Sequence, residues 1–260
     1  MISAPDAGSS ERFGYEWSVY ADLLPAHEEQ FLRWTEALPR VAWQGAHFLD
    51  VGCGMGRNSF WACRSGAVGG AAIDIDDRTL ASARRTLAGL PVQVRKESAY
   101  AIAGDAEFDV TFSIGVVHHL AEPAKALREM VRMTKPGGRV LIWVYGRENN
   151  AWLVRVMNPL RRRVFSRLPP AFPHLLSFGP AVVLWALLRL GFGRLEYLRL
   201  ARTFSFAHLR SIVFDQMLPR IAHYWTGAEA ATMMREAGLS DVRAVWVNEV
   251  SWSVVGVKRE

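Results

Sequence analysis

Three glycines at alternate positions interrupt the segment FLDVGCGMGRNSFW, which covers residues 48 to 61. A glycine in a strand or at the start of a helix destabilises that element, so it is kept where the backbone must turn tightly or approach a ligand. The apolar residues 46 to 51 predict a short buried strand, and residues 58 to 64 predict the start of a helix. With a second buried strand predicted at 71 to 76, the glycines lie in the first turn of a βαβ unit.

Strands and helices continue to alternate after this unit. Further strands are predicted at 92–98, 108–115 and 138–146, and helices at 77–87 and 122–135. This alternation predicts an α/β fold with a doubly wound, mostly parallel sheet. Ligands of such sheets bind at the carboxyl ends of the strands. The residues that fall there are Gly52, Asp74, Glu97, Ser113 and Tyr145.

The glycine loop and a following acidic residue together indicate a nucleoside ligand. Glycines before a helix let backbone N–H groups approach a ligand at the helix N-terminus. Asp74 ends the second strand about 20 residues later, where a carboxylate accepts hydrogen bonds from ribose hydroxyls. The dinucleotide fingerprint Gly-x-Gly-x-x-Gly is incomplete, because Arg57 or Ser59 stands at its third glycine. The spacing therefore favours a cofactor other than a dinucleotide, and a mere surface turn would leave Asp74 unexplained.

Four segments, LDVGCGMGR, AIDID, FDVTFSIGVVHHL and RMTKPGGRVLIWVY, follow one another over about residues 45–146. They resemble the motifs of class I S-adenosylmethionine-dependent methyltransferases. The N-terminal FGYEW and the C-terminal TGAEAATMMREAG and WSVVGVK are similar to the type 11 branch. The resemblance implies a Rossmann-like seven-stranded sheet with helices on both faces and an antiparallel last strand. The composition of the segment after the fifth strand adds the prediction of an inserted helical cap. A C-terminal helix capped by Thr226 and Gly238 would precede a hairpin of 242–248 with 252–258.

The same resemblance divides the chain into four parts. Residues 1–44 would form a tail and an aromatic lid, and 45–146 the S-adenosylmethionine-binding core. Residues 147–225 would form a basic, mainly helical cap on the substrate side. Residues 226–260 would add the last helix and hairpin to the sheet.

The resemblance also implies a cofactor site. Asp50 and the three glycines would shape the loop around the methionine part, Asp74 would hold the ribose and Ile75 would pack on adenine. KESA stands where the family has a Gly-Asp pair, so Glu97 with Ser98 would bind the adenine amino group. The end of the fourth strand would contribute backbone contacts. The expected cofactor-binding residues are thus Asp50, Gly52, Gly54, Gly56, Asp74, Ile75, Glu97, Ser98, Ser113 and Ile114.

Transfer of a methyl group from a sulfonium is an in-line displacement, in which positioning and exclusion of water contribute much of the catalysis. His118 follows the fourth strand and is a candidate base, whereas His119 is expected to pack under the loop and bond to backbone. His223 is a second candidate base. Tyr145 either lines the substrate site or is a strand tyrosine with a hydrated hydroxyl. No metal site is expected.

Two segments rich in aromatic residues are candidates for binding the acceptor. FDQMLPRIAHYW, residues 214 to 225, contains Asp215 and Tyr224 among apolar residues that could equally form the core of the cap. Near the N-terminus, Tyr15 and Trp17 belong to an aromatic segment. We interpret it as a lid over the cofactor, or alternatively as the cover of a helix face.

Basic charge is concentrated in one part of the chain. Residues 147–202 contain ten arginines, two glutamates and neither lysine nor aspartate, a formal charge of +8 in a chain of +6. The segment includes RRRVFSR, with Arg161, Arg162 and Arg163, and the apolar AVVLWALLRLGF. This combination suits a cap over the substrate or a surface that contacts anionic lipid. A solvated basic face is the alternative, and nucleic-acid binding is not expected because no RNA-binding module accompanies the charge.

Cysteine content and apolar runs indicate a cytoplasmic protein. Cys53 and Cys63 are the two cysteines, and one lies in the glycine loop, so a secreted disulfide framework is not expected. The start MISAPDAGSSER lacks the pattern of a signal peptide. The longest apolar run, 175–188, is about 14 residues and contains Gly179-Pro180, whereas a bilayer requires about 20. No transmembrane helix is therefore expected.

The function predicted from the sequence is methyl transfer from S-adenosylmethionine, with release of S-adenosylhomocysteine, to a small-molecule acceptor such as a metabolite or natural product. A lipid or tRNA acceptor is the alternative suggested by the basic segment. From other classes, a nicotinamide-dependent oxidoreductase and a non-catalytic nucleoside-cofactor-binding protein remain open. The oligomeric state, the acceptor and the choice between O-, N- and C-methylation are also open.

Overall fold

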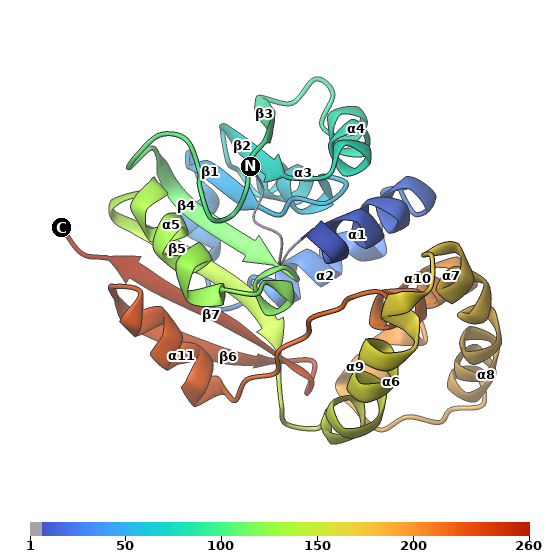
Figure 1. Cartoon of the computed structure of the whole chain (residues 1–260). Helices are drawn as coiled ribbons and strands as arrows, with labels where there is room; N and C mark the ends of the chain where they lie inside the picture. The colour runs from blue at the N-terminus through green and yellow to red at the C-terminus, as the bar shows by residue number, and fades with distance from the viewer. Residues whose placement is uncertain (1–6) are drawn as a thin grey trace.

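A computed structural model describes residues 7–260 and contains one seven-stranded sheet at its centre (Figure 1). The strand order is β3-β2-β1-β4-β5-β7-β6. Strands β1 to β5 pair in parallel, and β7 runs antiparallel between β5 and β6. The predicted doubly wound sheet with an antiparallel last strand is confirmed. The strands are β1 (His47–Val51), β2 (Gly69–Asp74), β3 (Val92–Lys96), β4 (Phe108–Ile114), β5 (Thr134–Tyr145), β6 (Leu239–Val247) and β7 (Ser251–Lys258).

Helices cover both faces of the sheet and form a separate group beyond its carboxyl edge. The α-helices are α1 (Ala7–Val19), α2 (Ala26–Trp34), α3 (Arg57–Arg64), α4 (Asp77–Thr86), α5 (Pro123–Met133), α6 (Asn158–Arg163), α7 (Ala171–Leu176), α8 (Phe178–Arg189), α9 (Glu196–Ala201), α10 (Phe206–Met217) and α11 (Gly227–Glu236). The short helical turns are η1 (Arg40–Trp43), η2 (Val117–His119), the π-helical η3 (Leu153–Met157) and η4 (Phe165–Arg167).

Side chains of β1 alternate between two apolar layers. Phe48 packs with Trp43 and Phe112 on the face covered by α2 and α3. Leu49 packs with Leu127 and Met130 of α5 on the opposite face. A strand buried on both sides needs a nearly continuous apolar sequence. The strand that precedes the glycine loop could therefore be predicted from its apolar residues.

The C-terminal helix begins and ends as its sequence predicts. Thr226 Oγ1 accepts from Glu229 N at 3.2 Å, and the Glu229 carboxylate accepts from Thr226 N at 2.8 Å. Gly238 follows the helix with φ +98°. By contrast, the helix expected to reach Lys135 ends at Met133. Thr134 instead pairs with Phe108 and begins β5, so strand pairing overrides local helix propensity there.

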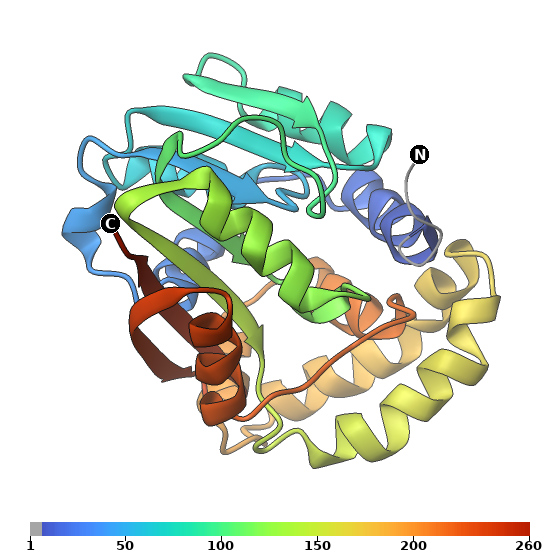
Figure 2. The ribbon, with the colours of Figure 1, turned by 60° about the vertical axis from the view of Figure 1, so that its left-hand side comes forward.

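The residues between β5 and α11 form a helical cap that contains α6 to α10 (Figures 1 and 2). In both views α1 lies between this cap and α4. Arg12 of α1 donates to the Leu218 carbonyl at 2.6 Å and the Leu168 carbonyl at 2.8 Å, both in the cap. On the core side, Ser82 Oγ donates to the Trp17 carbonyl at 3.0 Å. The predicted aromatic lid is thus a helix bonded to both the core and the cap.

One helical stretch of the cap is longer than the sequence predicts. The stretch Ala171–Arg189 comprises α7, the turn residue Ser177 and α8; it covers 19 residues with a mean hydropathy of 1.7, long and apolar enough to cross a membrane by length and composition. The apolar run of about 14 residues identified in the sequence, 175–188, therefore lies within a longer helical stretch. Pro180 stands in the first turn of α8, where the backbone N–H has no intrahelical partner, so a proline is tolerated.

Candidate functional site

The glycine loop after β1 requires glycine by conformation and by space. Gly52, Gly54 and Gly56 have φ of +75°, +55° and +85°, a region that other residues rarely adopt. A Cβ on Gly52 would lie 2.5 Å from the Val116 side chain, and one on Gly54 would lie 3.2 Å from the Trp17 ring. The loop is therefore a close-fitting backbone surface at the carboxyl end of β1.

Asp74, at the end of β2, turns its carboxylate toward this loop. It accepts hydrogen bonds from Gly54 N at 3.2 Å, Ile75 N at 2.8 Å and Asp76 N at 3.2 Å. Burial raises the pKa of Asp74 to about 6, although the three N–H donors oppose that shift. A carboxylate offers about four lone-pair positions, so Asp74 retains acceptor capacity for a hydroxyl group such as a ribose hydroxyl.

Asp50 is fully buried below the loop. Ser59 Oγ donates to its Oδ2 at 2.7 Å, whereas Oδ1 has no hydrogen-bond partner among the residues that the structure describes. Burial, together with the Asp74 charge, raises the pKa of Asp50 to about 7. Orphaned buried acceptors are rare in folded proteins. The Asp50 oxygen, the close-fitting glycines and the acceptor capacity of Asp74 therefore suit an amino-acid nucleoside such as S-adenosylmethionine.

The raised pKa of Asp50 predicts a pH-dependent stability. Its ordinary value is 3.8 and its folded value about 7, so folded Asp50 keeps a proton that the unfolded chain has released between these values. The stabilisation is present at low pH and is lost as pH rises, by up to about 1.4 kcal/mol per pH unit for one proton. We expect Asp50→Asn to flatten the fall in unfolding free energy between about pH 5 and pH 7, measured by urea denaturation without cofactor.

The matched control for this measurement is Asp22→Asn, which removes an exposed carboxyl group. It should leave the slope of stability against pH as in the wild type. An Asp50→Asn protein with the wild-type slope would contradict the assignment.

Asp74 itself provides a test of the cofactor site. We expect Asp74→Ala to weaken S-adenosylhomocysteine binding by about 1–3 kcal/mol, because ribose hydroxyls would lose a charged acceptor in a mostly desolvated site. Calorimetric titration of the folded variant measures the effect. Wild-type affinity would show that Asp74 does not hold the ribose.

The side chains of Glu97 and Ser98, which were expected near adenine, make hydrogen bonds and an ion pair within the protein. Glu97 N donates to the Asp74 carbonyl at 3.1 Å, which places Glu97 beside the site. Its carboxylate, however, lies 3.3 Å from Arg95 Nε and accepts from Ala103 N at 3.1 Å. Ser98 Oγ accepts from Tyr100 N at 3.2 Å. These contacts order the loop after β3, so an adenine contact by Glu97 or Ser98 stays a prediction.

At the end of β4, the side chains of the two predicted residues point to partners within the fold. Ser113 Oγ donates to the Val51 carbonyl at 2.8 Å, and Ile114 is buried in the core. Ile75, after β2, is half-buried. This arrangement leaves the backbone of Ser113 and Ile114 as the part that could contact a cofactor.

A polar cluster lies at the carboxyl end of β5, where the core meets the cap. Tyr145 Oη donates to Asp215 Oδ2 at 3.1 Å and accepts from Gln216 Nε2 at 2.9 Å. The Tyr145 ring centroid is 3.9 Å from that of His118 and 5.5 Å from that of Tyr224. Burial raises the pKa of Asp215 above its ordinary value. The predicted residues Tyr145, Asp215 and Tyr224 are thus brought together.

Two further charged residues in this cluster were missed by sequence reasoning. Glu16 of α1 is 2% exposed, and burial and the Asp215 charge raise its pKa well above its ordinary value. The Arg57 guanidinium lies 5.3 Å from the ring centroid of Trp17 and 5.1 Å from that of Trp34. The available signals were the position of Glu16 inside FGYEW and that of Arg57 directly after the last loop glycine. The cluster therefore combines two carboxyl groups, a guanidinium and a phenol.

The three predicted histidines differ in environment. His118 is fully buried, burial lowers its pKa well below the ordinary value, and in the described part of the chain neither ring nitrogen has a hydrogen-bond partner. His119 Nδ1 lies 2.8 Å from the Ile221 carbonyl, the backbone contact expected for it. His223 Nε2 lies 3.1 Å from the Leu120 carbonyl. Because a carbonyl only accepts hydrogen bonds, Nε2 is the donor in this contact. In the neutral ring with the proton on Nε2, His223 Nδ1 is an acceptor.

The two aromatic residues expected to bind the acceptor lie at different places. Tyr15 contacts the cap, with its ring centroid 6.0 Å from that of Phe214 and 5.9 Å from that of His174. Trp17 lies against Gly54 of the glycine loop. Trp17 is therefore closer to the expected cofactor side than to the acceptor side.

Arg161 is not part of the basic surface, contrary to expectation. It is 1% exposed, and its guanidinium donates to the Gln216 carbonyl at 2.7 Å and to Asn158 Oδ1 at 3.0 Å. The reason is that its guanidinium reaches Gln216 of α10, which buries Arg161 while Arg162 and Arg163 stay exposed. Arg161 thus fixes the segment that carries Asp215 and Gln216.

Comparison with known proteins shows similarity to a methyltransferase family over part of the chain. Residues 49–142 match the family model described as "Methyltransferase domain". The ubiquinone biosynthesis O-methyltransferases of Pseudomonas putida and Azotobacter vinelandii are each 32% identical, over 146 and 148 residues. These matches cover 54% of this chain and 62% of the relatives' length.

Solved structures support the fold. An O-methyltransferase family protein from Burkholderia thailandensis aligns with a TM-score of 0.58 at 14% identity, covering 99% of this chain and 61% of that one. Human N-acetylserotonin methyltransferase in complex with S-adenosylmethionine aligns with a TM-score of 0.54 at 13% identity, covering 97% and 57%. At these identities the comparison supports the fold alone.

Proposed function

We propose that this chain is a class I S-adenosylmethionine-dependent methyltransferase of the type 11 branch, as the family match of residues 49–142 supports, and that it methylates a small-molecule acceptor held between the core and the cap. The observation that carries the proposal is the Tyr145–Asp215–Gln216 cluster, which lies at the same sheet edge as the glycine loop. Ligands of doubly wound sheets bind at this edge.

When bound, S-adenosylmethionine supplies an electrophilic methyl group on a sulfonium. We propose that Asp50 and the glycine loop hold its methionine part and that Asp74 holds its ribose, as their unused acceptor capacity suggests. Trp17 would cover the loop and exclude water from it. These residues position the methyl donor, and α1 carries Trp17 and Glu16 into the same space.

The acceptor is proposed to be a hydroxyl compound. The O-methyltransferase relatives favour this class, and a hydroxyl nucleophile must lose a proton. Asp215 is a buried carboxylate whose pKa is raised above its ordinary value by burial, which makes it a stronger proton acceptor than an exposed carboxylate. Tyr145 and Gln216 would orient it through their hydrogen bonds. The Nδ1 acceptor of His223 is the second candidate.

A labelled-methyl transfer assay tests the proposed function. The protein is incubated with methyl-labelled S-adenosylmethionine and a cell extract, and the products are separated into small molecules, phospholipids and tRNA. Label in a small-molecule hydroxyl compound supports the proposal. Label confined to phospholipid or tRNA would contradict it, and so would the absence of label in all three fractions from a protein that binds S-adenosylhomocysteine.

A further inference from the structure

Exposed apolar side chains are concentrated in one part of the cap. Among the described residues, 17 large apolar side chains are exposed, and 14 of them lie between Trp152 and Phe192, with exposed fractions from 37% to 74%. They are Trp152, Val156, Leu160, Val164, Phe172, Leu175, Leu176, Phe178, Val182, Val183, Trp185, Leu187, Leu190 and Phe192. Soluble monomers rarely leave so many apolar side chains on consecutive elements, so this surface indicates an interaction.

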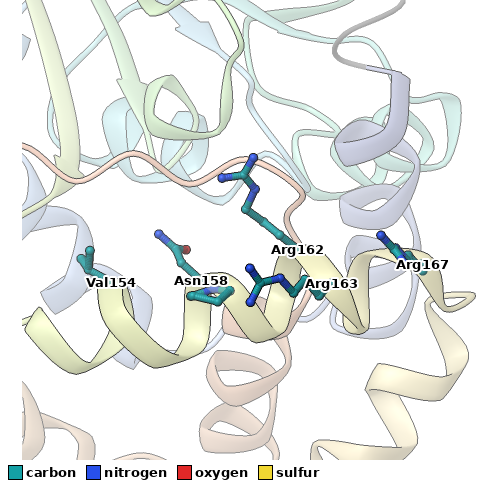
Figure 3. Close-up of a pocket in the computed structure, with 6 residues that line it drawn as sticks. Val154, Asn158, Arg162, Arg163 and Arg167 are labelled. Carbon is teal, nitrogen blue, oxygen red and sulfur yellow. The ribbon is translucent and has the colours of Figure 1, made fainter.

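The same elements carry positive charge without any acidic residue. Residues 149–195 contain seven arginines and no aspartate, glutamate or lysine. Arg162, Arg163 and Arg167 line a hollow of about 510 Å³ along α6 and the turn after it, together with Val154 and Asn158 (Figure 3). Within residues 7–260, no ion pair is formed by these three arginines. The hollow therefore presents uncompensated guanidinium groups, which bind phosphate oxygens well.

The packing of α8 distinguishes a helix that lies on a membrane from one that crosses it. Ala181 and Leu188 are 0% and 3% exposed, and Leu188 packs with Leu209 of α10. By contrast, Val183 of α8 is 60% exposed, and Leu190, the residue that follows α8, is 74% exposed. A helix with one face in a protein core and the other uncovered fits the plane of a membrane interface, whereas a spanning helix would be surrounded by lipid. In Figure 1, α8 lies at the outer edge of the cap, away from the sheet.

We propose that the segment from Trp152 to Phe192, here called the docking surface, binds the surface of an anionic phospholipid bilayer. Its exposed apolar side chains enter the boundary between headgroups and acyl chains, and Arg162, Arg163 and Arg167 bind headgroup phosphates. Charge complementarity selects this partner, because the surface has only positive charges and a bilayer with anionic lipids is negative. Tryptophans such as Trp152 and Trp185 prefer the interface between the two regions. The docking does not depend on which acceptor the site methylates.

Vesicle co-sedimentation tests the docking surface. The full chain is mixed with vesicles of phosphatidylcholine alone or with about 30 mol% phosphatidylglycerol, at low salt and at about 0.5 M NaCl. We expect binding to the anionic vesicles that weakens at high salt. Two variants separate the contributions: Arg162→Glu/Arg163→Glu/Arg167→Glu, and Val183→Ser/Leu187→Ser/Leu190→Ser. Each should lower the affinity for anionic vesicles at least about tenfold.

The matched control is Arg40→Glu/Arg64→Glu/Arg84→Glu, which makes the same change in charge at exposed arginines outside the cap. It should keep most of the binding, and all variants should bind S-adenosylhomocysteine as the wild type does, which shows that they are folded. Wild-type protein that stays in the supernatant with anionic vesicles would overturn the proposal. Equal loss in the control and arginine variants would do so as well. If the wild type instead forms a dimer that the serine variant abolishes and binds no vesicle, the surface is an interface with a second copy.

Discussion

Replacing Gly54 with valine is expected to abolish cofactor binding, with a loss of at least about 1000-fold, or about 4 kcal/mol. Gly54 has φ +55°, and a Cβ there would already lie 3.2 Å from the Trp17 ring. The branched side chain must displace either Trp17 or the loop backbone that bonds to Asp74. Both lie in the proposed cofactor site. Calorimetric titration with S-adenosylhomocysteine measures the change.

Gly89→Val separates backbone strain from loss of the site. Gly89 has φ +79°, and a Cβ there would meet no atom within 4 Å. Each variant therefore carries a left-handed strain of about 1–2 kcal/mol, but only Gly54→Val intrudes on the loop. Affinity near that of the wild type in a folded Gly54→Val protein would disprove the proposed position of the cofactor.

The second large effect is expected at Asp215. Loss of a general base slows turnover by about 100-fold or more, so Asp215→Asn should lower kcat to that extent and leave S-adenosylhomocysteine affinity within about twofold. The variant should remain folded, because burial raises the pKa of Asp215 and so disfavours the ionised form that asparagine removes. The rise of kcat with pH that accompanies ionisation of Asp215 should also disappear. Steady-state kinetics across pH measure both effects.

Tyr145→Phe is the comparison for this experiment. It removes the hydroxyl that donates to Asp215 but keeps the ring that packs against His118. A positioning role predicts a smaller loss of kcat, about tenfold, with the pH dependence preserved. If Asp215→Asn turns over at the wild-type rate while His223→Gln does not, the proton acceptor is His223 and the assignment to Asp215 is wrong.

The parts of the fold that local sequence determines were predictable. The glycine loop could be identified because three positive-φ positions need glycine, and β1 could be identified because both of its faces are buried. The capping box at Thr226 and Glu229 likewise acts within a single turn of helix. In each case the physical requirement is met by residues close together in the chain.

The parts that depend on tertiary docking were not predictable. Arg161 and Arg162 are neighbours in RRRVFSR, yet only Arg161 is buried, because its guanidinium bonds to Gln216 of α10 while Arg162 lines the exposed hollow. The polar cluster brings Glu16, Arg57 and Asp215 together from α1, α3 and α10. The residue pattern within any one of these segments does not indicate that the three side chains lie close together. The candidate cofactor residues lie in local motifs that the sequence displays, whereas the candidate acid–base residues come together only through tertiary packing.

The central claim, that this fold binds S-adenosylmethionine and not a dinucleotide, is tested most directly by calorimetric titration of the wild-type chain with S-adenosylhomocysteine and with NAD. We predict one S-adenosylhomocysteine bound per chain and no heat of binding with NAD. The third glycine of the dinucleotide fingerprint is replaced, and Asp50 Oδ1, which has no hydrogen-bond partner among residues 7–260, can accept a hydrogen bond from the bound cofactor. Binding of NAD without binding of S-adenosylhomocysteine would contradict the account.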